Sequence, residues 1–339
     1  MRIPVAVTVA AAACGVVAGA VFTWSAAVSG PSDLSSAAVS ARPSASAAAR
    51  ARAHQAKPAP PATPAPSPVV VTGAPGNVQA RAGALEVATT GTLLWSEGLN
   101  TELPMGSITK VMTALVVIES GDLNREIQVP SSVIAYVNKY DGNSAGLQPG
   151  DVLTAQELLE ALLLPSGCDA AYTLALAYGP GMPAFLAKMN ATARQLGLMH
   201  TYFTSPDGLP YPTEYSTYST PADLIRLGQA AMKLPVFSAM VAQQSYTLPA
   251  GPGHHAYSWQ NDNDLIGSYP GAQGIKTGFT NAAGHCLLFQ VSRDGLTLIG
   301  VVLGSPATGP AAGAQAAVQV LNWGFSLPRR PVPAAAASP

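Results

Sequence analysis

Cysteine and histidine are scarce in this chain, whose 339 residues include three cysteines and five histidines. Cys14 falls in an apolar N-terminal run, so Cys168 and Cys286 are the only pair that could form an internal disulfide. Cys286 lies inside a predicted strand and is expected to be a buried apolar residue instead. The histidines lack the spacing of metal ligands, so no metal site, zinc peptidase or cofactor is predicted, and His285 is expected at the surface.

Positive charge is scarce in the central part of the chain. Residues 1–77 hold five basic residues and one acidic residue, for a net charge of +4. Residues 78–326 hold 10 basic and 17 acidic residues, for a net charge of −7, and Arg329 and Arg330 follow. A negatively charged globular part argues against a nucleic-acid partner.

The N-terminal segments lack the patterns of a folded domain. Residues 3–24 carry no charge and are long enough to span a bilayer, so residues 1–28 are predicted to be a signal peptide or signal anchor. Residues 29–77, rich in Ala, Pro and Ser, predict a disordered linker, because they offer too little apolar surface to offset chain entropy. Residues 327–339 are expected to be a disordered tail. Membrane contact would therefore come from the N-terminus alone, and the protein would act outside the membrane, secreted or tethered to its outer face.

Residues 78–326 are predicted to form one catalytic domain with a substantial core. Thr154 and Glu157 form a capping box before one helix, and Thr220 with Pro221 begins another. Asp294 and Gly295 predict a tight hairpin turn. Strands are predicted at 84–88, 92–95, 274–278, 285–292 and 296–303, and helices at 108–118, 158–164, 169–178, 183–196, 221–233 and 310–325. Strands at both ends with helices between them indicate an α+β fold, with an antiparallel sheet, a helical lobe and a functional cleft between them.

The most informative motif is Ser107-Ile-Thr-Lys110, at the start of an apolar helix that Gly121 ends. Residues three apart share one face of a helix, so the Lys110 amine is expected beside the Ser107 hydroxyl. A lysine can activate a serine where burial or another cation lowers its pKa, and the N–H groups of the helix start would face the group attacked. Taken alone, the pattern more often marks a serine beside a surface lysine, and it is the motifs that follow which favour the catalytic interpretation.

Two further motifs fall where the cleft is expected. Ser166-Gly-Cys168 is a short loop between two helices, and Lys276-Thr-Gly278 ends a strand. A strand lysine attracts a carboxylate, the threonine hydroxyl can hydrogen-bond it, and glycine lets an extended peptide lie along the strand. An edge-strand lysine can also serve only to prevent aggregation. The order Gly-Lys-Thr of a phosphate loop is absent.

Together these three motifs resemble the penicillin-recognising serine enzymes. The chain is more closely similar to the D-alanyl-D-alanine carboxypeptidase family of low-molecular-mass penicillin-binding proteins, across roughly residues 80–325. Segments 105–115, 150–167, 206–209, 218–220 and 274–284 carry this resemblance. It implies a five-stranded antiparallel sheet flanked by helices, plus an all-α lobe. The implied partners are peptidoglycan stem peptides ending in D-Ala-D-Ala, with β-lactam antibiotics as covalent inhibitors.

The resemblance also implies roles for single residues. Ser107 would be the acylated nucleophile, Lys110 its base, and Ser166 a proton relay to the leaving D-alanine. Lys276 would lower the pKa of Lys110. The substrate-binding residues would be Cys168, Lys276, Thr277, Gly278 and Phe279: Lys276 and Thr277 would hold the terminal carboxylate, and the backbone N–H groups of Ser107 and Phe279 would form the oxyanion hole. Transfer of the acyl group to water is carboxypeptidase activity, and transfer to an amine is transpeptidase activity.

The sequence departs from the family pattern at Cys168, where Asn is usual. A thiol is a weak donor and a weak acceptor, so substrate alignment or deacylation would differ. Similar exported Streptomyces DD-transpeptidases carry the same Ser-Gly-Cys, so activity is still expected. Cys168 is not expected to be a nucleophile itself, since no histidine is evidently paired with it.

Two alternatives remain on the same fold. A class A β-lactamase needs a deacylating glutamate after the Ser-Gly-x loop, and Glu214 is the only glutamate between Cys168 and Lys276. The residues around Glu214 do not match the Glu-x-x-Leu-Asn context of that enzyme. Without a deacylating glutamate, a long-lived penicilloyl adduct is favoured over hydrolysis of the penicillin. A non-catalytic penicillin-binding or wall-binding module would have no need of a serine paired with a lysine.

Overall fold

The computed structural model describes residues 69–306, 309 and 311–329. The predicted signal segment, most of the predicted linker and most of the predicted tail lie outside these residues. The end of the linker and the start of the tail meet within the described part. Val69 forms a β-bridge with Arg329, and the Val70 amide donates a hydrogen bond of 2.9 Å to the Pro328 carbonyl.

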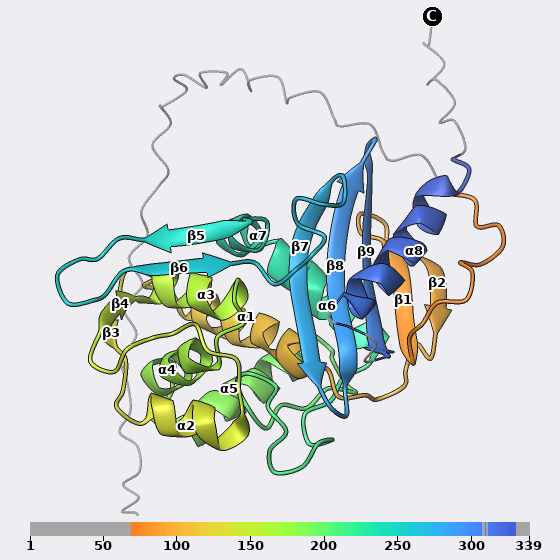
Figure 1. Ribbon diagram of the computed structural model, residues 1–339. Coiled ribbons are helices and arrows are strands. Elements are labelled where there is room, and N and C mark those ends of the chain that lie inside the picture. The colour runs from red at the N-terminus through yellow and green to blue at the C-terminus, as the bar shows by residue number, and fades with distance from the viewer. Residues whose placement is uncertain (1–68, 307–308, 310, 330–339) are drawn as a thin grey trace, which may run out of the picture. The chain divides into compact units, whose positions relative to one another are not determined.

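A five-stranded antiparallel sheet forms one layer, as expected (Figure 1). The strand order is β2-β1-β9-β8-β7, so β7 is an edge strand. Asp294 and Gly295 both have positive φ angles (51° and 73°), as the turn of the β8–β9 hairpin requires. The strands are β1 (Ala82–Val87), β2 (Thr92–Glu97), β7 (Ala272–Thr280), β8 (Gly284–Arg293) and β9 (Leu296–Ser305).

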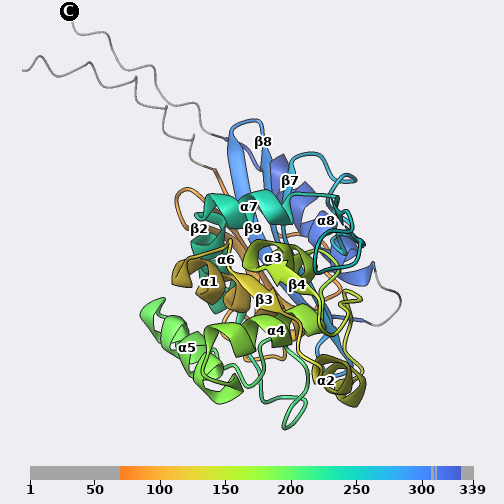
Figure 2. The same cartoon turned by 90° about the vertical axis from the view of Figure 1, so that its left-hand side faces the viewer.

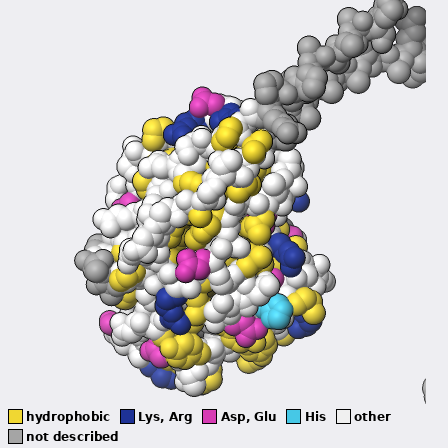
Figure 3. Space-filling view, turned by 90° about the vertical axis from the view of Figure 1, so that its right-hand side faces the viewer, with side chains coloured by type: hydrophobic (Ala, Val, Ile, Leu, Met, Phe, Trp, Pro, Cys, Tyr) yellow, Lys and Arg dark blue, Asp and Glu magenta, His cyan; other side chains and the backbone are white. Residues whose placement is uncertain are grey.

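Helices cover both faces of this sheet. Gly324 of α8 (Ala312–Ser326) lies against Leu298 of β9, and Gly228 of α6 (Pro221–Met232) lies against Ile299. Side chains of successive strand residues point to opposite faces, so these two helices lie on opposite sides (Figures 1 and 2). The sheet is therefore buried on both faces. Figure 3 shows the side of the molecule that lies on the right in Figure 1, where charged side chains are scattered among hydrophobic and other uncharged ones.

The remaining helices form a lobe beside the β7 edge (Figure 2). Its capping predictions are confirmed: Thr154 accepts from the Glu157 amide at 3.2 Å, and Glu157 accepts from the Thr154 amide at 2.8 Å. Thr220 likewise accepts from the Asp223 amide at the start of α6. The lobe contains α1 (Lys110–Ser120), α2 (Val133–Tyr140), α3 (Ala155–Leu163), α4 (Cys168–Tyr178) and α5 (Met182–Gln195).

Several short elements were not predicted. They are α7 (Pro235–Val241), the pair β3 (Glu126–Gln128) and β4 (Val152–Thr154), and the pair β5 (Ser245–Leu248) and β6 (Tyr257–Gln260), in addition to α2. Strands of three or four residues and helices of seven or eight show too few periods for a reliable pattern. Of the described helices, none is by itself long and apolar enough to cross a membrane; α6 and α7 meet that test only as a pair bent by 107°.

Candidate active site

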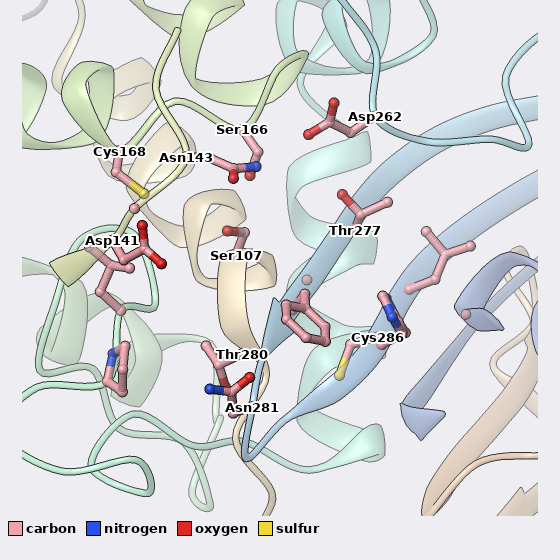
Figure 4. Close-up of a pocket in the computed structure, with 18 of the residues that line it drawn as sticks. Ser107, Asp141, Asn143, Ser166, Cys168, Asp262, Thr277, Thr280, Asn281 and Cys286 are labelled. Atoms are coloured by element: carbon pink, nitrogen blue, oxygen red, sulfur yellow. The ribbon is translucent and has the colours of Figure 1, made fainter. Parts of the chain in front are cut away.

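A cleft of about 700 Å³ opens between the β7 edge and the helical lobe (Figure 4). Residues from all three motifs line it: Ser107, Ser166, Cys168, Thr277, Gly278 and Phe279. The cleft also contains His285, and residues that the sequence did not single out, including Tyr140, Asp141, Asn143 and Asp262. Loop and strand residues far apart in sequence therefore meet at one site.

Ser107 lies in a short 3₁₀ helix, Gly106–Thr109, which continues directly into α1. The Lys110 ammonium group donates a hydrogen bond of 2.8 Å to Ser107 Oγ, as the three-residue spacing predicts. It also donates to Cys168 Sγ at 3.4 Å and to the Asp207 carbonyl at 3.2 Å. Lys110 is completely buried, which excludes the alternative of a solvated surface lysine. These contacts hold the amine in place beside the hydroxyl.

Ser166 and Cys168 lie on the other wall: Ser166 is in the loop between α3 and α4, and Cys168 is the first residue of α4. Ser166 has a φ of 62° and is 2% exposed, and its Oγ has no hydrogen-bond partner within the part of the chain that the structure describes. Burial raises the pKa of Cys168 to about 12, although the charge of Lys110 acts in the opposite direction. Cys168 is therefore a neutral thiol near pH 7, a poor nucleophile.

Lys276 is buried in β7, with its Nζ 3.0 Å from Thr277 Oγ1. Burial lowers the pKa of Lys276 to about 7, and the charge of Lys110 acts in the same direction, whereas Asp262 opposes it. The charge of Lys110 thus contributes to the lowered pKa of Lys276. Thr277 presents its hydroxyl to the cleft beside Lys276.

The backbone of β7 touches the 3₁₀ helix directly. A Cβ atom on Gly278 would overlap the Met105 carbonyl oxygen and lie 3.2 Å from the Ser107 amide nitrogen. A Cβ atom on Gly106 would lie 2.7 Å from the Phe279 amide nitrogen. Only glycine at both positions allows this close approach between the segments that carry the Ser107 and Phe279 amides, and both residues line the cleft.

The remaining polar groups near the cleft come from segments that carry little or no sequence signal. His285 is partly buried rather than simply at the surface: its ring lies 4.6 Å from that of Phe279, and burial lowers its pKa. Asp207 is 1% exposed and accepts a hydrogen bond of 2.8 Å from the Tyr136 hydroxyl. Segment 206–209 carried a family signal, whereas Asn143 and Asp262 belong to loops without any motif.

Neither described cysteine is in a disulfide: Cys168 and Cys286 are both buried free thiols. Cys286 lies within β8, as expected for an apolar position. No group of His, Cys, Asp and Glu in the described residues could hold a metal ion. The chemistry available is a serine beside a buried lysine, a second lysine beside a hydroxyl, and two backbone N–H groups, which together can support acyl transfer.

Comparisons with known proteins agree with this geometry. A family model described as D-alanyl-D-alanine carboxypeptidase matches residues 69–307. A D-alanyl-D-alanine carboxypeptidase of Streptomyces sp. (strain K15) is 39% identical over 250 residues, covering 70% of this chain and 84% of that protein. The D-alanyl-D-alanine carboxypeptidase DacB2 of Mycobacterium tuberculosis is 38% identical over 240 residues, covering 70% of this chain and 79% of that protein. The crystal structure of the Streptomyces K15 DD-transpeptidase aligns with a TM-score of 0.71 and 36% identity, covering 76% of this chain and all of that one.

Proposed function

This chain belongs to the D-alanyl-D-alanine carboxypeptidase family, and from that premise we propose how its residues carry out the reaction. The chain is a serine-type carboxypeptidase that removes the terminal D-alanine of peptidoglycan stem peptides and binds β-lactams. In our proposal the acyl group is carried by Ser107. The observation that supports this most strongly is the 2.8 Å contact between the buried Lys110 amine and Ser107 Oγ.

In the proposed acylation step, Lys110 in its unprotonated form takes the proton from Ser107 Oγ. The oxygen attacks the carbonyl carbon of the penultimate D-alanine, and the N–H groups of Ser107 and Phe279 stabilise the developing oxyanion. Each such donor typically contributes about 3 to 4 kcal/mol. The C–N bond then breaks, and the proton passes through Ser166 to the nitrogen of the leaving D-alanine. Water later hydrolyses the ester and restores Ser107.

Substrate binding is assigned to β7 and the opposite loop. Protonated Lys276 and Thr277 would hold the terminal carboxylate, because an ammonium group and a hydroxyl 3.0 Å apart can bind its two oxygens together. Gly278 would let the peptide lie along the edge of β7, extending the sheet. Cys168 would line the substrate site beside Lys110 with a thiol that can form only weak hydrogen bonds.

Transpeptidation is a second candidate activity. One of the structural neighbours is named a DD-transpeptidase, and 100% of that chain is covered by the alignment. In this reaction an amine replaces water as the acceptor of the acyl group. Adding an amine acceptor to a D-alanine release assay tests this activity, and no crosslinked product at any acceptor concentration would exclude it.

We also assign the enzyme to the outer side of the membrane. Family members act on peptidoglycan, which lies outside the membrane, so an extracytoplasmic location follows for the catalytic domain, proposed here as residues 78–326. The uncharged run at residues 3–24 would serve as signal peptide or anchor, and residues 29–77 would serve as the linker.

An intact-mass time course with benzylpenicillin tests the proposed chemistry. The purified chain should gain one penicilloyl group, and Ser107→Ala should gain none. Consumption of penicillin without a lasting adduct would instead indicate a β-lactamase. Neither adduct nor turnover would indicate a non-catalytic binding module. Release of D-alanine from a D-Ala-D-Ala peptide by the wild type, and not by Ser107→Ala, completes the test.

A further inference from the structure

The wall of the cleft that faces β7 includes a loop that no sequence motif marks. We propose that Asn143 on this loop recognises the amide bond of the acyl group through its side chain, and that Asp169 is the positioning residue that holds the loop. This inference rests on the proposed acyl-enzyme at Ser107. It assigns a specificity-determining residue to the same cleft.

Asp169 organises the loop through its carboxylate. It is 1% exposed, and it accepts hydrogen bonds from Ser144 Oγ at 2.6 Å and from the amides of Ala145 and Leu147 at 2.9 and 3.1 Å. It also accepts from the amide of Ala170 at 2.9 Å. The three amides can only donate, so a carboxylate, which only accepts, suits this position and an amide side chain does not.

The same loop is fixed against the Ser166–Cys168 segment. The Cys168 amide donates a hydrogen bond of 2.8 Å to the Asn143 carbonyl. A Cβ atom on Gly142 would lie 3.1 Å from both Cβ and Sγ of Cys168. Figure 4 shows Asn143 and Ser166 on the same side of the cleft, across from Thr277. The Asn143 backbone is thus fixed, and its side chain lies on the same wall as Ser166.

An extended acyl group along β7 can bond the strand with only one side of its backbone. Its other side faces the loop wall and needs polar partners there. Cys168 is poorly suited, because a thiol bonds weakly and its sulfur already accepts from Lys110 at 3.4 Å. Asp141 can accept but not donate. Asn143, exposed in the cleft, offers both an N–H donor and a carbonyl acceptor.

The test compares two β-lactams that differ in the group recognised. In benzylpenicillin, as in the peptide, an amide is attached to the carbon next to the carbonyl that Ser107 attacks. In 6-aminopenicillanic acid this amide is replaced by a free amine. We expect Asn143→Ala to slow acylation by benzylpenicillin roughly 10-fold, the effect of one good hydrogen bond, and to leave acylation by 6-aminopenicillanic acid unchanged. Asn138→Ala, on the exposed side of α2, is the matched control.

Asp169→Asn tests the positioning role. We expect the same selective loss of the acylation rate with benzylpenicillin. Adding Asn143→Ala should cause little further loss, because both changes remove the same contact. An equal slowing of both β-lactams by Asn143→Ala would show a general structural effect and overturn the proposal, as would no effect on either. If neither compound acylates the wild type, the proposed function fails instead, so the two failures are distinguishable.

Discussion

Ser166 combines a strained backbone with a hydroxyl that faces the cleft and makes no hydrogen bond to the described residues. Its φ of 62° is in the left-handed region, and its buried Oγ has no hydrogen-bond partner within the described residues. The left-handed backbone costs on the order of 1 kcal/mol or more. Such a cost at a cleft residue is typical of a position selected for function rather than for stability.

We therefore expect Ser166→Gly to stabilise the fold and impair the enzyme. Glycine relieves the strain of the left-handed backbone, which outweighs its greater chain entropy, so the free energy of unfolding should rise by up to about 1 kcal/mol. The loss of the proton relay should lower kcat/KM for D-alanine release by about 100-fold. Urea unfolding and a D-alanine assay measure both effects. Ser166→Ala, which retains the strain, is the control, and unchanged activity in both variants would contradict the assigned role.

Lys276 should make stability depend on pH in a defined direction. Its pKa is about 7 in the folded chain, lowered mainly by burial, compared with 10.5 for an ordinary lysine. Between these values the unfolded chain binds a proton that the folded chain has released, so the free energy of unfolding rises with pH. The wild type should gain stability relative to Lys276→Met from pH 7 to 10, by at most about 1.4 kcal/mol per pH unit.

Chemical unfolding at several pH values measures this difference between the two proteins. Lys233→Met, which removes an exposed lysine after α6, controls for the loss of a positive charge. A parallel pH dependence in wild type and Lys276→Met would show that Lys276 stays protonated throughout the range.

At the scale of elements, the decisive contact is that between β7 and the 3₁₀ helix before α1. It joins the edge of the sheet to the helical lobe by backbone atoms, with Gly278 against Met105 and Ser107. No side chain can adapt in such a contact, so the position of the two N–H groups depends on the absence of a Cβ atom.

Gly278→Ala should therefore displace β7 from the 3₁₀ helix. We expect acylation by benzylpenicillin to slow by at least about 100-fold, comparable with the loss of an oxyanion donor, together with a lower melting temperature. Gly313→Ala in α8 is the matched control, because its new Cβ would have neighbours no closer than 3.5 Å. Normal acylation by Gly278→Ala would show that the N–H groups are not used.

At the scale of the whole molecule, the N-terminal segment should decide where the enzyme works. The substrate lies outside the membrane, so a chain without residues 3–24 should fold but stay in the cytoplasm. In intact producing cells, a labelled penicillin should bind the full chain and fail to bind the shortened one. After lysis both should be labelled. Labelling of the shortened chain in intact cells would show that another route exports it.

The sequence by itself determined the main elements and the reacting pair. The elements β8, β9 and α1 can be predicted because their apolar residues recur at regular local spacings. The Ser107–Lys110 contact follows from a spacing of three residues within one helical turn. The capping box at Thr154 and the turn at Asp294 are likewise local. For such features the interacting groups are neighbours in the chain.

Only the tertiary structure decided how the distant parts meet. The lowered pKa of Lys276 depends on burial and on Lys110. The place of Asn143 in the cleft depends on a loop held by remote partners, and that of His285 depends on the pairing of β7 with β8. Asp169 holds its loop through residues more than 20 positions away, which no local pattern encodes. Burial and long-range contact arise when the sheet and the helical lobe pack together, so they follow from the fold rather than from any short segment.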